Sequence, residues 1–214
     1  MKWQLALDRM SITQAVEMAK SAGPYADWIE VGTSLIKMYG MESVRAMKSA
    51  FPEKTIVADI KTFDNARYEF AMCFEAGAAI ATVMGAAPAT TVELCARTAE
   101  DYGKGYMIDL LNVPEDRIEQ LCGFDGAILC FHLGKDQQEH EGTRFERVKG
   151  GAFKHAGDGL SVALAGGIRL EVLPELMLHR PDLIIVGEAV TKAPDPAAAA
   201  KQLSDFIKSR GDEC

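Results

Sequence analysis

The chain has 214 residues, an apolar content of 48% and a formal net charge of −8 at pH 7, with no run of lysine and arginine. This length fits one large domain or two small ones, and the apolar content is sufficient for a sizeable core. An acidic chain without a basic tract argues against a nucleic-acid-binding surface, and no apolar stretch is long enough to span a membrane. We therefore expect neither nucleic acid nor a membrane as a partner.

The cysteines bear on the compartment of the protein. Their number is odd and their spacing is wide, without a CxxC or another metal-ligand pattern. They are Cys73, Cys95, Cys122, Cys130 and Cys214. The first residues lead directly into a predicted strand rather than into a signal peptide. We expect a cytoplasmic protein with reduced thiols and no catalytic cysteine.

Short apolar runs alternate with segments of helical periodicity along the chain. The runs predict strands at 4–8, 27–32, 55–61, 79–84, 105–110, 126–132, 160–165 and 183–187. The intervening segments predict helices after a cap at Ser11 or Thr13, at 36–50, 65–75 and 90–100, after Pro114, and at 144–155, 170–178 and 196–209. The segment 144–155 contains a pair of glycines that would interrupt its helix.

These repeated units predict the fold class, which is α/β. The strand runs lack polar alternation, as expected of parallel strands that are buried on both faces by helices. Eight units without a linker favour a single (β/α)₈ (TIM) barrel over residues 1–210, with a frayed tail at 211–214. An open doubly wound sheet is the alternative, but no GxGxxG motif follows the first strand.

Ionisable residues occur at or near the carboxyl ends of the predicted strands. They are Asp8, Glu30, Asp59, Lys61, Asp109 and His132. In a barrel these ends meet at one mouth, where active sites lie. The placement therefore predicts an active site, whereas His140, His155 and His179 fall on loops or helices and are expected to be solvated.

The segment after the third apolar run carries an acid, a base and an acid. Alternation along the strand places Asp59 and Lys61 on one face, and Asp64 follows where the chain turns toward a helix. Glu30 and Asp59 end neighbouring strands and are suited to share Mg²⁺. Lys61 would remain protonated and stabilise an enediolate, and His132 would carry a proton. The alternatives are a surface salt-bridge cluster and a structural histidine.

Glycines end the last two strands. Gly166 and Gly167 follow the seventh, and Gly187 follows the eighth. In barrels these two turns commonly bind a phosphate through backbone N–H groups, so we predict a phosphorylated substrate; simple turn glycines are the alternative. Glu188 is an exception at this predicted site, because its carboxylate would repel a dianion unless it points away or pairs with a cation such as Arg169 or Lys192.

The motif Asp59-x-Lys61-x-x-Asp64 and the strand-end residues resemble the orotidine monophosphate decarboxylase suprafamily, in the branch of 3-hexulose-6-phosphate synthase and 3-keto-L-gulonate-6-phosphate decarboxylase. The resemblance implies metal ligation by Glu30 and Asp59, a metal-stabilised enediolate next to Lys61, and proton transfer assisted by His132. It also implies that Asp8 binds substrate hydroxyls. A homodimer with shared active sites is implied as well, in which Asp64 reaches into the partner's site.

Details of the motifs bear on the choice within this branch. Thr62, Asp109 with Ile108 before it, and Ala165 before the glycine pair look like the synthase, whereas Lys135 looks like a basic residue of the decarboxylases. We favour an aldolase that condenses formaldehyde with D-ribulose 5-phosphate. The alternatives are a decarboxylase that gives L-xylulose 5-phosphate and CO₂, and a non-catalytic barrel that binds a sugar phosphate.

Overall fold

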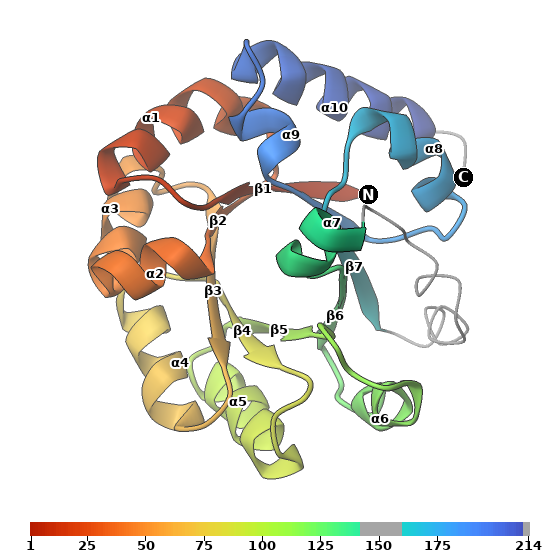
Figure 1. The fold of residues 1–214 in the computed structure, drawn as a ribbon. Coiled ribbons are helices and arrows are strands. Elements are labelled where there is room, and N and C mark those ends of the chain that lie inside the picture. The colour runs from red at the N-terminus through yellow and green to blue at the C-terminus, as the bar shows by residue number, and fades with distance from the viewer. Residues whose placement is uncertain (142–159, 212–214) are drawn as a thin grey trace.

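Eight parallel strands close into a barrel in the computed structural model, which describes residues 1–141 and 160–211. The strands are β1 Lys2–Leu7, β2 Trp28–Val31, β3 Thr55–Thr62, β4 Ile80–Met84, β5 Gly105–Asp109, β6 Ile128–His132, β7 Ser161–Ala165 and β8 Leu183–Val186. Each strand pairs with the next in sequence, and β8 pairs with β1. The predicted (β/α)₈ barrel is thus confirmed (Figure 1).

Helices surround the barrel and connect its strands (Figure 1). They are α1 Ile12–Ala22, η1 Gly23–Tyr25, α2 Thr33–Tyr39, α3 Met41–Ala50, α4 Ala66–Glu75, α5 Ala89–Asp101, α6 Glu115–Leu121, α7 Lys135–Glu141, η4 Leu170–Val172, α8 Leu173–Met177, α9 Glu188–Thr191 and α10 Pro196–Gly211. Ser11 caps α1 in a reciprocal pair of hydrogen bonds with Gln14, as one of the two predicted caps. Within the described ranges, no helix is both long and apolar enough to cross a bilayer.

Some predicted elements differ from the structure. The helix expected at 36–50 is two helices, α2 and α3, because Gly40 has a φ of +58°, which glycine adopts readily and other residues do not. Two short helices that the sequence did not predict, α7 and α9, directly follow β6 and β8. The helix predicted at 144–155 lies outside the described residues. So does the predicted tail, apart from Gly211, which ends α10.

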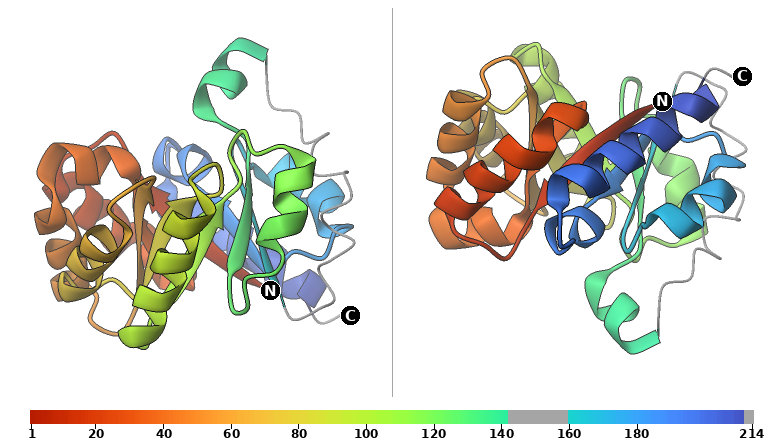
Figure 2. Two further views of the ribbon diagram at one scale, coloured as in Figure 1. Left: turned by 90° about the horizontal axis from the view of Figure 1, so that it is seen from below. Right: turned by 90° about the horizontal axis from the view of Figure 1, so that it is seen from above.

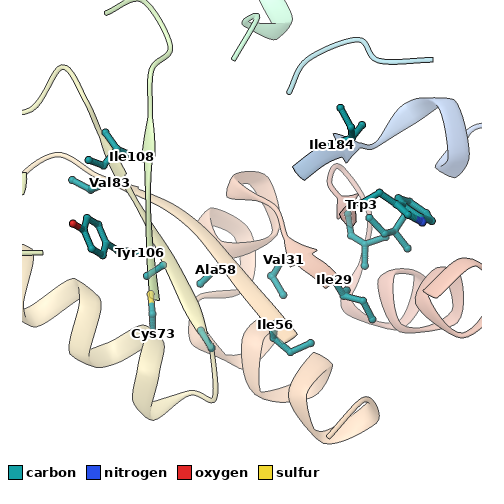
Figure 3. Packing of buried hydrophobic residues seen from close by; sticks show 14 of the residues in the cluster. Trp3, Ile29, Val31, Ile56, Ala58, Cys73, Val83, Tyr106, Ile108 and Ile184 are labelled. Carbon is teal, nitrogen blue, oxygen red and sulfur yellow. The ribbon is translucent and has the colours of Figure 1, made fainter. Parts of the chain in front are cut away.

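The strands are apolar on both faces, which explains why their sequences lack polar alternation. Residues that face outward pack against the helices (Figure 3), among them Trp3, Ile29, Val31, Ile56 and Ile108. Residues that face inward form a second cluster in the barrel interior: Val57, Ile80, Met107, Cys130, Ala163, Ala165, Leu183 and Ile185. Full burial of one large apolar side chain contributes about 1.5–3 kcal/mol, so these two layers dominate the stability.

Candidate active site

At the carboxyl ends of the strands, the side chains that face the barrel interior are ionisable rather than apolar. Glu30, Asp59, Lys61, Asp109 and His132 line a cavity of about 1060 Å³ at this end. Residues that follow the strands complete the lining, among them Asp8, Gly166, Gly167, Gly187 and Glu188. The structure therefore brings together the six residues that the sequence predicted for one mouth.

Lys61 lies at the centre of a network of ion pairs. Its Nζ lies 3.0 and 2.9 Å from the two carboxylate oxygens of Asp59 and 2.7 Å from Oδ2 of Asp109. Strand β3 bulges here, because the chain advances four positions from Ala58 to Thr62 while the paired strand β4 advances only two, from Ala81 to Val83. Lys61 itself has a φ of +53°, which is uncommon outside glycine and often marks a functional site.

The network fixes the charges of its members. Burial lowers the pKa of Lys61, but the carboxylates of Asp59 and Asp109 outweigh it and hold that pKa above its usual range. Burial also raises the pKa of Asp109, and here His132 and Lys61 outweigh it and hold the pKa below its usual range. At neutral pH the network therefore contains an ammonium and a carboxylate.

His132 is oriented by the same carboxylate. Its Nδ1 lies 2.9 Å from Oδ2 and 3.2 Å from Oδ1 of Asp109. Because an ionised carboxylate only accepts hydrogen bonds, Nδ1 carries the hydrogen, and Nε2 remains for the cavity that His132 lines. The ring is thus held in one tautomer at the mouth.

Asp59 is held from several directions. Its Oδ2 accepts a hydrogen bond from Thr33 Oγ1 at 2.6 Å, and its Oδ1 accepts one from Thr82 Oγ1 at 2.9 Å. Thr33 and Thr82 were not predicted as site residues. Their signal in the sequence was weak, since threonine at a strand end or a helix start is common.

Glu30 lies opposite Val57 of β3, and Asp59 follows two residues farther on the same face. Burial and the Asp59 carboxylate raise the pKa of Glu30 to about 8. Among residues 1–141 and 160–211, no group of three or more His, Cys, Asp or Glu side chains is arranged for a metal ion. Two carboxylates nevertheless fit Mg²⁺, which uses one or two protein carboxylates and completes its shell with water and substrate oxygens.

The glycine turns have the geometry of an anion cradle. Gly166 and Gly167 have φ values of +100° and +67°, and a Cβ atom on Gly166 would lie 2.2 Å from the backbone oxygen of Leu133. In the described part of the chain, the N–H groups of Gly167 and Gly187 donate no hydrogen bond to the protein. Both glycines line the cavity, so these groups are available to a ligand.

Glu188 pairs with two lysines. Its Oε2 lies 2.7 Å from Lys135 Nζ and its Oε1 lies 2.8 Å from Lys192 Nζ, which holds the pKa of the carboxyl below its usual range. The predicted pairing with Lys192 is confirmed, whereas Arg169 lines the cavity without bonding to Glu188. Lys135 was not predicted as a partner because it lies on α7, which stands out from the end of the barrel in Figure 2.

The two remaining carboxylates behave differently. Asp8 lines the cavity, and its Oδ1 accepts hydrogen bonds from the backbone N–H and the hydroxyl of Ser34 at the start of α2. Asp64 is exposed and is not among the residues that line the cavity of its own chain.

Comparisons with known proteins agree with this geometry. The family model for the orotidine 5′-phosphate decarboxylase / HUMPS family matches residues 1–203. The 3-hexulose-6-phosphate synthase of Bacillus subtilis strain 168 is 35% identical over 209 residues, which cover 97% of this chain and 99% of the relative.

Solved structures give the same result. A crystal structure of 3-hexulose-6-phosphate synthase from Salmonella typhimurium aligns with a TM-score of 0.92 and 32% identity, covering 98% of this chain and 99% of the other. A 3-keto-L-gulonate-6-phosphate decarboxylase from Vibrio cholerae aligns with a TM-score of 0.82 and 27% identity, covering 96% and 97%. The resemblance predicted from the motif is confirmed, and the prediction of a lyase agrees with these names. This chain belongs to the orotidine 5′-phosphate decarboxylase / HUMPS family.

Proposed function

We propose that this chain catalyses the reaction of a 3-hexulose-6-phosphate synthase, the condensation of formaldehyde with D-ribulose 5-phosphate. The observation that carries the proposal is the position of Lys61, an ammonium held by Asp59 and Asp109 at the floor of a cavity large enough for a sugar phosphate. A fixed cation there stabilises the enediolate that such an aldol reaction requires. Full-length relatives that bear this name support the choice of substrate.

Different residues of the mouth bind different parts of the substrate. The backbone N–H groups at Gly166, Gly167 and Gly187 bind the phosphate, and Asp8 and Asp109 bind hydroxyl groups. Glu188 lies beside the phosphate, and its lysine partners offset its charge. Binding at both ends holds C1 of the ketose next to Lys61 and orients it for reaction.

His132 is the residue that transfers protons. Its Nε2 takes the proton from C1 of ribulose 5-phosphate, and the electron pair moves into the enediolate next to Lys61. The enediolate carbon then bonds to the formaldehyde carbon, whose oxygen becomes an alkoxide and receives the proton from His132. Asp109 holds the ring in the required tautomer throughout. The reverse sequence cleaves the product.

Glu30 and Asp59 are the residues that would hold Mg²⁺, since their carboxyl groups lie on the inner face of the neighbouring strands β2 and β3 and both line the cavity. Mg²⁺ at this position would act as a Lewis acid that offsets negative charge on the substrate oxygens.

A homodimer with shared active sites completes the proposal. Asp64 lies outside the cavity of its own chain and is flanked by two aromatic side chains that are largely exposed, Phe63 at 54% and Tyr68 at 70%. Exposed apolar groups next to a polar functional residue support a contact surface, from which Asp64 would reach the site of a second copy. The dispersed cysteines support placing this dimer in the cytoplasm.

One observation favours a second candidate, the decarboxylase of 3-keto-L-gulonate 6-phosphate. Lys135, which resembles a basic residue of the decarboxylases, lines the same cavity as His132. A barrel that binds a sugar phosphate without turnover is the third candidate.

An assay of both substrates, each with and without Mg²⁺, separates these candidates. We expect consumption of formaldehyde that requires both ribulose 5-phosphate and Mg²⁺, and no release of CO₂ from the keto-gulonate ester. Release of CO₂ alone would assign the decarboxylase. Calorimetric binding of either ester without turnover would assign the binding protein.

A further inference from the structure

A buried amide lies directly against the carboxylates of the mouth. Gln4 faces the barrel interior from β1, has no solvent exposure, and donates a hydrogen bond from Nε2 to Oε2 of Glu30. Its neighbours Trp3 and Leu5 face the outer helices, so Gln4 is a polar residue inside an otherwise apolar stretch of the strand. The sequence shows this polar position, but its partner is visible only in the structure.

Gln4 is poorly explained as a stabilising residue. Its Oε1 is buried without a hydrogen-bond partner among the described residues. In the sheet, Gln4 lies beside Ile185 of β8 and Trp28 of β2, and neither side chain donates a hydrogen bond to that oxygen. An apolar side chain of similar shape would avoid burying an unpaired polar atom, so the amide serves another purpose.

The hydrogen bond to Glu30 indicates that purpose. Asp59 is oriented by Thr33, Thr82 and Lys61, whereas in the described part of the chain Gln4 is the one hydrogen-bond donor to the side chain of Glu30. Gln4 holds Oε2 and leaves Oε1 of Glu30 for the cavity. Groups behind a metal ligand that fix its orientation in this way strongly affect metal affinity.

We propose that Gln4 is a positioning residue that orients Glu30 to bind a hard divalent cation together with Asp59. The inference rests on the proposed function, which places that cation between these carboxylates. Gln4 touches neither the cation nor the substrate, so its contribution passes entirely through Glu30.

The test measures metal affinity rather than turnover. The full-length protein, stripped of metal with a chelator, is titrated with MnCl₂ while free Mn²⁺ is followed by electron paramagnetic resonance, and the Kd values are checked with MgCl₂ by calorimetry. Gln4→Met keeps the length of the side chain and removes the donor. We expect its Kd for Mn²⁺ to rise about 10- to 100-fold. The thermal midpoint of the metal-free protein should change little, because losing the bond to Glu30 is offset by removing the unpaired Oε1.

Ser204→Ala is the matched control. Ser204 lies on α10, away from the mouth, and its hydroxyl is the other buried side-chain atom without a partner among the described residues. We expect this variant to alter the thermal midpoint at most, with the Kd for Mn²⁺ unchanged.

The outcomes separate this inference from the proposed function. If the wild type binds Mn²⁺ and Gln4→Met binds it equally well, the role of Gln4 is overturned while the metal site stands. If the wild type binds neither Mn²⁺ nor Mg²⁺, both are overturned. Gln4→Asn retains the amide but is one methylene too short to reach Glu30. It should show the same loss, and it decides the question if Gln4→Met does not fold.

Discussion

The mouth of the barrel has a buried half and an exposed half. In the buried half, formed by the ends of β2, β3, β5 and β6, the side chains of Lys61 and Asp109 are 22% and 4% exposed. In the exposed half, formed by the loops after β6 and β8, those of Glu188 and Lys192 are 42% and 67% exposed. Both halves contain ion pairs of similar length, 2.7 Å for Lys61–Asp109 and 2.8 Å for Lys192–Glu188.

Equal distances have different consequences in the two halves. Breaking a buried pair leaves an uncompensated charge away from water, which destabilises a protein by about 3–5 kcal/mol, whereas an exposed pair contributes about 0–1 kcal/mol. The buried half is therefore fixed in position and suited to stabilising an intermediate. The exposed half rearranges at little cost and is suited to admitting and holding the phosphate end of a substrate.

Lys61→Ala tests the buried half most strongly. Because the fixed ammonium faces the developing anion, we expect kcat/KM to fall by about 10²–10³-fold or more, with the fold retained in circular dichroism spectra. Lys201→Ala, which removes an exposed lysine paired with Asp205 on α10, is the control and should leave kcat/KM unchanged. Wild-type turnover by Lys61→Ala would refute the proposed mechanism.

Asp64 sharpens the comparison, because it is exposed and yet assigned to catalysis. If it serves the second subunit, Asp64→Ala should lower kcat by about 100-fold, as loss of a group acting in proton transfer or transition-state binding does. Mixing and re-associating inactive Asp64→Ala and Lys61→Ala chains should then restore about a quarter of the wild-type activity. Half of randomly formed dimers are mixed, and one of their two sites is intact. No recovery, with mixed dimers detected by native mass spectrometry, would place Asp64 outside the partner's site.

The two halves also differ in how far the sequence predicted them. In the buried half, side chains project from strands whose inward face follows from simple alternation, so Glu30, Asp59, Lys61, Asp109 and His132 were placed correctly. The hydrogen bonds of Thr33 and Thr82 were not foreseen, since they depend on the register between strands and on the bulge in β3.

The exposed half was harder to predict for a physical reason. Helix α7 has the sequence KDQQEHE, which contains no apolar periodicity because the helix stands out from the barrel and buries no apolar face (Figure 2). The contact between Lys135 and Glu188 therefore could not be predicted from the sequence alone. The break at Gly40 was missed for a similar reason, since a glycine inside a helical pattern does not by itself reveal a positive φ.

Asp109→Asn tests the buried half by pH. The pKa of Asp109 in the folded state lies below the unfolded value of about 3.9, so its contribution to stability is fully present above that value and is lost as pH falls toward the folded pKa. We expect urea unfolding at pH 7 to show the variant less stable by about 3 kcal/mol, as for a broken buried pair.

This difference should persist to about pH 5 and shrink by about 1 kcal/mol at pH 3. Asp125→Asn, at a loop residue outside the cavity, is the control. A difference that is independent of pH would show that Asp109 acts through packing rather than charge.

Glu188→Gln is expected to have the smallest effect, and it is the sharpest test of the exposed half. The carboxylate lies beside the proposed phosphate cradle, so its removal eliminates a repulsion and releases Lys135 and Lys192 toward the dianion. KM for ribulose 5-phosphate should fall by about 2- to 5-fold at low salt and by less at 0.3 M NaCl, where exposed charges are screened. The free energy of unfolding should change by less than about 1 kcal/mol.

Glu93→Gln, which breaks an exposed pair with Arg97 on α5, controls for the loss of a surface carboxylate. A higher KM would mean that Glu188 holds its two lysines in position for the phosphate. The ion pairs of the exposed half would then be fixed for substrate binding, as those of the buried half are for catalysis.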